Sequence, residues 1–274
     1  MAIYSNTRIV LRHLTARLMN DLITGTVVSP GSGTFVCAET PWEVADDYFN
    51  KYLEVFCYAG TGVGTSGNPT DWVNSTHTLT FLPAATLTAG DSVEMHLLYR
   101  VGEYNDAINL AIDMAARDAL LHKVDESITL DDDTYQYTLP TQFLWVHSIQ
   151  MESSTSGVYD SETPIDPRYW RILKAATLEL EFVKNLWSPT DGRVLRIDGL
   201  ASPSKLDIDT EACPIDPFYV VQQAAAILHQ SRIRGADDES KFHTTQMAIC
   251  QKLADTQLAR MRVSVGGARP VVEV

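Results

Sequence analysis

Leucines recur at steps of three and four residues near the start of the chain, at Leu11, Leu14, Leu18 and Leu22. This spacing is the period of one face of an α-helix, so the pattern predicts a first helix with a buried leucine face. Ser5 or Asn6 can cap its start, and we expect it to end near Gly25.

The pattern then changes to short β-rich runs at residues 25–29, 34–38, 52–58, 78–82 and 92–98, separated by clusters of Gly, Pro, Asn and Ser. Five short strands joined by turns predict a small barrel or sandwich. Helical spacing returns at Glu103 and continues to about His122, with five residues on one face: Tyr104, Ile108, Ala111, Ala115 and Ala119. The β module is therefore predicted to be an insertion between two helices.

A second β-rich stretch follows, with strand-like runs at 127–130, 135–139, 144–151, 169–173, 177–182 and 194–197. The run at 177–182 alternates between apolar and polar residues, as a strand with one solvated face does. Asp216 and Pro217 then form a helix-start signal, because the fixed φ of proline suits the first helical position.

That helix is followed, after Gly235, by another through about Arg262. We expect the two helices to form an antiparallel hairpin. The second helix is expected to face inward with four apolar residues: Phe242, Ile249, Leu253 and Met261.

Together these elements predict an α+β fold of about four helices with an inserted small β-barrel or sandwich module and a second β-rich region. The predicted helical core comprises residues 1–24, 99–126 and 201–262. The inserted module covers 25–98, and the second β region covers 127–200. Residues 263–274 lack a helical pattern and are expected to form an extended C-terminal arm.

The net charge of the chain excludes some classes of function. The 274 residues include 35 acidic and 21 basic side chains, for a net charge of −14. Such a chain is unsuited to general binding of the nucleic-acid backbone, which depends on excess Lys and Arg. Arg8 and Arg12 interrupt any apolar core of a signal peptide, and no run reaches the roughly 18 apolar residues of a membrane span. The sequence predicts a protein made in a cytoplasm, with no membrane partner.

Three motifs offer candidate binding chemistry, and each has a plainer interpretation. Gly62, Gly64 and Gly67 match a dinucleotide fingerprint, but no helix follows them, so we expect a loop between strands. The acidic run at 131–133 lacks the glycine of a calcium loop, so we expect a solvated turn. The alternating acids at 207, 209 and 211 would share one face of an extended segment, where they would bind a divalent cation or simply face solvent.

Catalytic motifs are not found. The seven histidines show no H-E-x-x-H spacing, and no serine lies in a G-x-S-x-G motif. The four cysteines, Cys37, Cys57, Cys213 and Cys250, are too far apart for a zinc cluster and are expected to be buried thiols. The sequence therefore predicts no enzyme, no metal and no cofactor. An alternative is a glycan-binding or glycan-cleaving protein that stacks sugars on Trp72 and Tyr58.

The C-terminal end differs in charge from the rest of the chain. After Leu258 it contains three arginines and one acid, Glu273, on a molecule that is otherwise strongly acidic. A basic, valine-rich arm can add a strand or an arginine contact to an acidic neighbouring subunit. The candidate partner-binding residues are Arg260, Arg262, Arg269, Pro270, Val271 and Val272.

The order of parts, with four short motifs, resembles the head-to-tail adaptor (neck or connector) proteins of tailed bacteriophages. The motifs are GEYNDAIN at 102–109, YQYTLP at 135–140, LRIDGL at 195–200 and GARPV at 267–271. The resemblance implies a virion structural protein in the neck. It implies a ring of identical subunits, twelve if it matches the portal, that docks under the portal protein and contacts a further neck or tail protein.

Such a ring would continue the DNA channel, and an acidic inner wall would let the genome pass without specific binding. The nearest alternative within the structural class is a tail-tube or baseplate protein. A sixfold or threefold assembly would favour that alternative.

Overall fold

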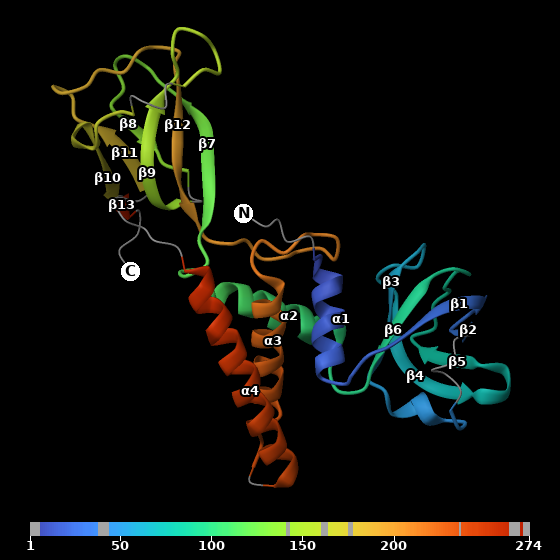
Figure 1. Cartoon of the computed structure of the whole chain (residues 1–274). Coiled ribbons are helices and arrows are strands. Elements are labelled where there is room, and N and C mark those ends of the chain that lie inside the picture. The colour runs from blue at the N-terminus through green and yellow to red at the C-terminus, as the bar shows by residue number, and fades with distance from the viewer. Residues whose placement is uncertain are drawn as a thin grey trace. The chain divides into compact units, whose positions relative to one another are not determined.

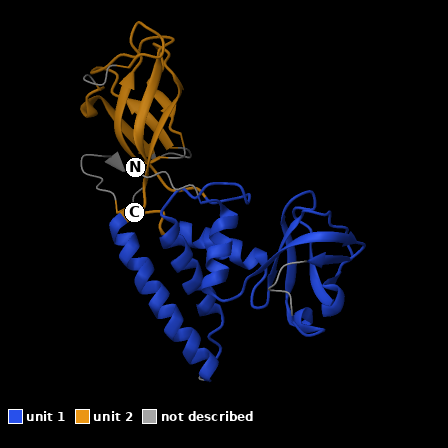
Figure 2. Cartoon of the chain, turned by 45° about the vertical axis from the view of Figure 1, so that its right-hand side comes forward, with its two compact units in different colours: residues 1–114, 205–260 blue, residues 115–204, 261–274 orange. Residues whose placement is uncertain are grey.

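The computed structural model describes residues 6–37, 44–140, 143–159, 164–174, 178–235, 237–262 and 269–270. The chain divides into two compact units (Figure 2): unit 1 comprises residues 1–114 and 205–260, and unit 2 comprises 115–204 and 261–274. The fold is α+β, and the described residues form four α-helices, a closed six-stranded barrel and two further sheets. The finer division into four parts remains a prediction.

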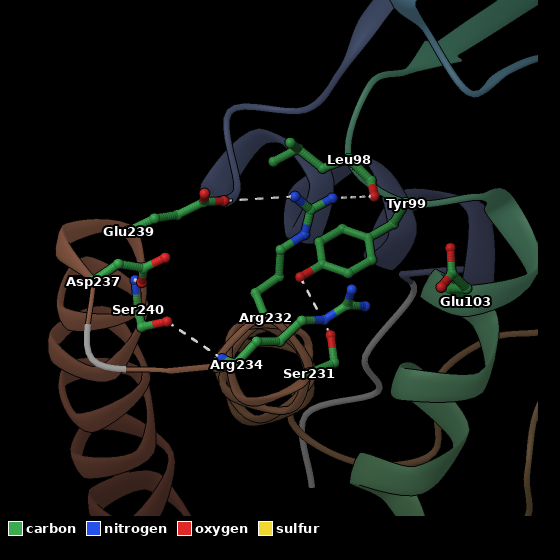
Figure 3. A pocket seen from close by; sticks show the side chains of 9 residues that line it. All are labelled: Leu98, Tyr99, Glu103, Ser231, Arg232, Arg234, Asp237, Glu239 and Ser240. Carbon is green, nitrogen blue, oxygen red and sulfur yellow. Dashed lines mark hydrogen bonds and ion pairs between the residues drawn. The ribbon is translucent and has the colours of Figure 1, made fainter.

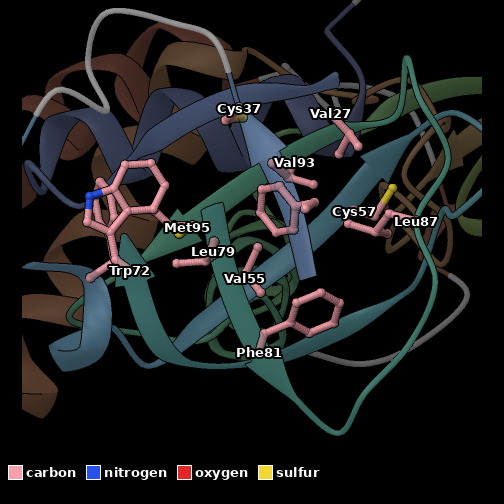
Figure 4. Close-up of a cluster of buried hydrophobic side chains, with 12 residues drawn as sticks. Val27, Cys37, Val55, Cys57, Trp72, Leu79, Phe81, Leu87, Val93 and Met95 are labelled. Carbon is pink, nitrogen blue, oxygen red and sulfur yellow. The ribbon is translucent and has the colours of Figure 1, made fainter. Parts of the chain in front are cut away.

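The barrel of unit 1 closes because its first and last strands pair with each other. Its strand order is β1-β2-β5-β4-β3-β6, and β6 pairs antiparallel with β1. The strands are β1 (Ile23–Gly31), β2 (Thr34–Cys37), β3 (Glu54–Ala59), β4 (Ser66–Val73), β5 (Thr78–Leu82) and β6 (Ser92–His96). Buried apolar side chains from every strand fill the interior (Figure 4). A closed barrel of this kind has no free strand edge.

The expectation of five strands was wrong, because β4 was missed. Its sequence, SGNPTDWV, contains Gly, Asn, Pro and Asp, which are typical of turns. The strand tolerates them for local reasons. A Cβ atom on Gly67 would lie 2.6 Å from Cδ2 of Phe81, so glycine permits the close approach of β4 and β5. Pro69 lies beside a break in the register of that pair.

Four α-helices complete the helical part of the described chain: α1 (Arg8–Leu18), α2 (Val101–Met114), α3 (Pro217–Ser231) and α4 (Asp238–Met261) (Figure 1). None of them is both long enough and apolar enough to cross a membrane. The short 3₁₀ helices are Tyr48–Lys51, Asn74–Thr76 and Pro167–Tyr169.

The predicted start of α3 is confirmed, because the carboxylate of Asp216 accepts a hydrogen bond from the backbone N–H of Phe218. The predicted antiparallel hairpin is confirmed as well. Hydrogen bonds join Gln223 to Gln251 and His229 to His243 across α3 and α4. Burial, with His243 beside it, lowers the pKa of His229 to about 4.

The buried face of α1 is not the predicted leucine face, and the helix ends at Leu18 rather than near Gly25. Leu11 is buried, but Leu14 and Leu18 are 39% and 44% exposed. Arg12 is fully buried in their place because two carboxylates bind its guanidinium. The ion pairs orient α1 so that Arg12, rather than Leu14 and Leu18, faces the interior.

The predicted inward face of α4 is wrong as well. Phe242, Ile249 and Leu253 are 55%, 48% and 41% exposed. The residues that α4 buries are small or polar: Ser240, His243, Cys250 and Ala254. The alanines of α3, at 224 to 226, are buried too. Small side chains therefore face the hairpin, which leaves the large apolar residues of α4 outside it.

Unit 2 contains a sheet of order β13-β9-β12-β7 and a smaller one of order β10-β11-β8, all antiparallel. The strands are β7 (Leu121–Thr129), β8 (Gln136–Thr138), β9 (Phe143–Met151), β10 (Trp170–Lys174), β11 (Leu178–Phe182), β12 (Val194–Ala201) and β13 (Arg269–Pro270). One buried apolar cluster, which includes Phe143, Ile149, Trp170 and Phe182, joins the two sheets.

The helix predicted at 103–122 is shorter than expected. It ends at Met114, a turn follows, and β7 begins at Leu121, where Leu121 pairs with Ala201 of β12. Ala115 and Ala119 are buried as predicted, although they lie beyond the helix. The partner strand lies about eighty residues away in sequence, so local spacing could not predict where the strand begins.

Candidate assembly surfaces

The glycine-rich loop after β3 is a structural turn and offers nothing to a phosphate. The buried carboxylate of Asp91 accepts hydrogen bonds from the backbone N–H groups of Thr61, Gly62 and Thr88, at 2.7, 3.1 and 2.7 Å. Gly60, at φ +107°, lies so close that a Cβ atom would meet the Asp91 side chain. The donors that an anion would need are already occupied.

The alternating acids at 207, 209 and 211 form no cation site, and of the three only Asp207 is exposed to solvent. Asp209 is ion-paired with Arg8 and Arg12, both at 2.9 Å. The carboxylate of Glu211 accepts hydrogen bonds from the backbone N–H groups of Asp207 and Ile208. No cluster of three or more metal-binding side chains occurs in the described parts of the chain.

The acidic run at 131–133 is a hydrogen-bonded turn. The Asp131 carboxylate accepts a bond from the backbone N–H of Asp133, at 2.9 Å. The hydroxyl of Tyr137 donates to the carbonyl oxygen of Thr134 nearby, at 2.8 Å.

A buried ionic cluster joins α1 to the barrel. The Arg12 guanidinium lies 2.8 Å from Glu94 of β6 and 2.9 Å from Asp209. Nε2 of His13 lies 2.6 Å from the second oxygen of Glu94. Burial alone would raise the pKa of Glu94, but the hydrogen bond with His13, the His96 ring 3.7 Å away and the charge of Arg12 lower it to about 2. Glu94 is therefore a buried anion held by Arg12 and His13.

Asp21 makes a second connection, between the end of α1 and the chain that leaves the barrel. Its carboxylate accepts hydrogen bonds from the backbone N–H groups of Leu97, Leu98 and Tyr99 and from the hydroxyl of Tyr104. Burial and this acidic neighbour raise the pKa of Tyr104 far above its ordinary value. Most of the polar groups between α1, β6 and α2 are thus paired within unit 1, whereas Nε2 of His96 has no hydrogen-bond partner among the described residues.

A cavity of about 410 Å³ lies at the tip of the α3–α4 hairpin (Figure 3). Its central cation, Arg232, donates a hydrogen bond to the Leu98 carbonyl at 2.6 Å and lies 4.9 Å from the ring centre of Tyr99. Glu239 is 3.9 Å from the same guanidinium. These contacts hold the hairpin against the segment after β6. We therefore interpret the cavity as part of a structural contact between the two.

Trp72, the main candidate for sugar stacking, is fully buried in the barrel and lies edge-on to Phe49 at 5.0 Å. Tyr58 packs edge-on against His13 at 4.8 Å. Trp72 therefore presents no open face for a sugar to stack on.

The four cysteines are buried, free thiols, as predicted. Burial raises the pKa of Cys57 and of Cys213 to about 11, and raises that of Cys250.

Large apolar side chains are exposed on every helix of unit 1. On α1 they are Val10, Leu14 and Leu18, on α2 Leu110 and Met114, on α3 Phe218, and on α4 Phe242, Ile249 and Leu253. Exposed apolar side chains that lie together can mark sites of protein contact. Part of it borders a groove of about 480 Å³ between α1 and α3, which is lined by Asn6, Leu14, Arg17, Leu18, Pro217, Phe218, Val221 and Gln222. We call this the α1–α3 groove.

The predicted partner-binding arginines do not form one cluster. Arg260 lies on α4 and donates to the side-chain oxygen of Gln257 at 3.3 Å. Arg262 is ion-paired with Asp118 at 3.1 Å. Arg269 and Pro270 form β13, which pairs antiparallel with Val146 and Trp145 of β9. Val271 and Val272 lie outside the described residues.

The sequence model of the SU10 adaptor protein family matches residues 78–272. The chain belongs to this family. The match runs from β5 to the end of the described chain, so it includes all of unit 2 that is described together with α2, α3 and α4. The resemblance to head-to-tail adaptor proteins is thereby confirmed: this is an adaptor protein of a phage-like particle, in a family of structural adaptors.

Comparison with solved structures finds a chain from a structure titled "Neck of empty GTA particle computed with C6 symmetry". It is 22% identical, with a TM-score of 0.25, and the match covers 61% of this chain and 79% of that one. No curated protein sequence matches this chain.

Sequence reasoning missed the α1–α3 groove and the exposed face of α4. Both arise from helices whose hydrophobic residues do not all face the same core. A signal was present in α1, where Arg12 lies one position after Leu11 and interrupts the leucine pattern. The acidic partners of Arg12 are distant in sequence, so the pattern alone did not reveal that arginine as a buried residue.

Proposed function

We propose that copies of this adaptor assemble into a closed ring in the neck of a tailed-phage particle, between the portal and the tail. The exposed apolar residues of the four unit 1 helices carry the proposal, because burial of such surface between subunits favours association. The protein acts by position and shape rather than by catalysis.

The ring continues the DNA channel, and its subunit number matches the twelvefold symmetry of a portal. Each subunit brings fourteen excess negative charges. If these line the channel, they repel the phosphate backbone and let the genome slide past without adhering. A measured potential of the inner wall tests this step: a positive wall would contradict it.

The C-terminal arm is the second element of the proposal. We place partner binding on Arg260, Arg262, Arg269, Pro270, Val271 and Val272, each as a separate contact with a neighbouring subunit or the portal. Deletion of residues 263–274 is expected to leave a folded chain that no longer joins the particle. A truncated chain that still assembles normally would remove the arm from the proposal.

Imaging of particles and of the purified chain tests the ring directly. We expect a ring of twelve copies immediately below the portal, assembled from protein made in the host cytoplasm. A sixfold or threefold assembly farther along the particle would instead favour a tail-tube or baseplate protein.

A further inference from the structure

One residue of the α1–α3 groove is polar, buried and unsatisfied. Gln222 is 8% exposed, and its Oε1 atom has no hydrogen-bond partner among the residues that the structure describes. Its neighbours in the groove are largely apolar, with Leu14, Leu18 and Phe218 among them. A buried acceptor without a donor is costly. Oε1 is covered in the isolated chain, so the Gln222 amide must turn toward the groove before a donor that arrives with an apolar occupant can reach it.

The exposed face of α4 has the matching composition. Phe242, Ile249 and Leu253 are spaced by seven and four residues, which places them on one side of the helix. Gln246 falls on the same side between Phe242 and Ile249, and its side-chain amide makes no hydrogen bond to any described residue. We call these four residues the α4 stripe: three apolar side chains with one amide donor among them.

Charges at the ends of the two surfaces define one orientation. The groove has Arg17 near the end of α1. Glu211 lies beside the first turn of α1, because its carbonyl accepts a hydrogen bond from Arg8 N–H at 3.0 Å. On α4, Glu239 is in the first turn and Arg260 in the last. Opposite charges meet at both ends only if α4 runs antiparallel to α1.

Within unit 1, α1 and α4 already run in opposite directions (Figure 1). Rotation about an axis along the helices preserves that order, so a neighbour related by such a rotation presents α4 in the orientation that the charges require. Distinct, complementary faces on one chain are what a head-to-tail cyclic ring needs.

We propose that the α1–α3 groove of each copy receives the α4 stripe of the next copy, with the amide of Gln246 donating to Oε1 of Gln222. This inference rests on the proposed ring and names the surfaces that close it. The contact is heterologous, since a copy offers its groove to one neighbour and its stripe to the other.

Disulfide trapping in assembled necks tests the contact. The variant Leu18→Cys with Phe242→Cys places one thiol in the groove and one on the stripe, at the ends where Arg17 and Glu239 would meet. The matched control is Leu18→Cys with Lys241→Cys, which moves the second thiol to an adjacent, exposed position about 100° around the helix. The four native thiols are buried and add little background.

Oxidation of the Phe242→Cys pair is expected to give a ladder of covalent oligomers on a non-reducing gel, and the Lys241→Cys pair is expected to give at least tenfold less. Rings that form normally but trap both pairs equally, or neither, would overturn this contact and leave the ring proposal standing. Chains that stay monomeric both in solution and in the particle would overturn both.

A double-mutant cycle tests the hydrogen bond. Gln222→Leu and Gln246→Leu are each expected to weaken ring association about tenfold, because each leaves the other group buried without a partner. The combination Gln222→Leu with Gln246→Leu removes both groups and is expected to recover most of the loss. Strictly additive losses, measured as the concentration for half-assembly, would show that the two amides do not meet.

Discussion

The barrel and the helices of unit 1 differ in where they keep their large apolar side chains. In the barrel, residues such as Phe35, Trp72 and Phe81 lie inside, each no more than 1% exposed, and every strand is paired on both sides. On the helices, Phe218 and Phe242 are about half exposed. The barrel encloses its large aromatic residues and exposes aliphatic ones such as Val28 and Leu82 on its outside, whereas the helices also expose aromatic rings.

A cluster of buried polar groups joins the two regions. Arg12, Glu94 and Asp209 form the centre of that junction, and Asp21 binds the segment after β6. Buried ion pairs of this kind restrict the relative position of the elements they join, because a buried charge without its partner is strongly destabilising. The junction therefore defines how the barrel is held against α1 while the helix faces remain free.

Loss of the junction cation is expected to have the largest effect. Arg12→Ala leaves Glu94 and Asp209 without their main partner and is expected to reduce the free energy of unfolding by about 3–5 kcal/mol. Urea denaturation measures it. Arg17→Ala, on the exposed side of the same helix, is the control and is expected to change stability by less than about 0.5 kcal/mol. Equal effects of the two variants would mean that the cluster is not a structural junction.

A matched pair of phenylalanine truncations separates the two regions. Phe81→Ala empties part of the barrel core and is expected to reduce stability by about 3–5 kcal/mol. Phe242→Ala removes an exposed ring and is expected to change the stability of the monomer by less than about 0.5 kcal/mol while weakening assembly. Thermal unfolding and sedimentation measure the two properties. A stripe variant that destabilised the monomer as strongly as the core variant would contradict the comparison.

Acid is expected to weaken the junction. The pKa of Glu94 is lowered in the folded chain to about 2, so its contribution is present above its ordinary pKa near 4.5 and is lost as pH falls from there toward 2. The full loss amounts to about 3 kcal/mol. Denaturation between pH 5 and pH 2 measures it, and Glu94→Gln is expected to flatten that part of the profile. An unchanged slope in the variant would assign the acid sensitivity to other carboxylates.

A substitution in the loop after β3 is expected to reduce the free energy of unfolding less than the loss of Arg12 does. Asp91→Asn replaces an acceptor of three backbone N–H groups with a side chain that has only one acceptor oxygen. We expect a loss of about 1–3 kcal/mol in equilibrium unfolding, with no effect on assembly of the folded chain. A variant that folds normally but fails to assemble would place this loop at an interface.

Local sequence patterns predicted the elements that depend on neighbouring residues. Asp216 and Pro217 start α3, and the helical face of Tyr104 and Ile108 is buried, because capping and helical spacing act within a few positions. The alternating run near residue 180 is β11 for the same reason. The C-terminal arm remains a prediction, since most of it lies outside the described residues.

Elements that depend on distant partners were missed. The start of β7 is set by β12, β4 is held in the barrel by β5, and the burial of Arg12 is set by Glu94 and Asp209. The candidate assembly surface was missed for the same reason. Phe242, Ile249 and Leu253 look like core residues in sequence, and only the small residues of the α3–α4 contact show that they lie outside.

Side-chain footprinting of assembled necks against the free chain tests the central claim most directly, because it reports both regions in one measurement. The account predicts strong protection of Phe242, Ile249 and Leu253 on assembly and little change at the exposed barrel residues Val28, Val63 and Leu82. Protection of the barrel residues with an unchanged α4 would contradict it.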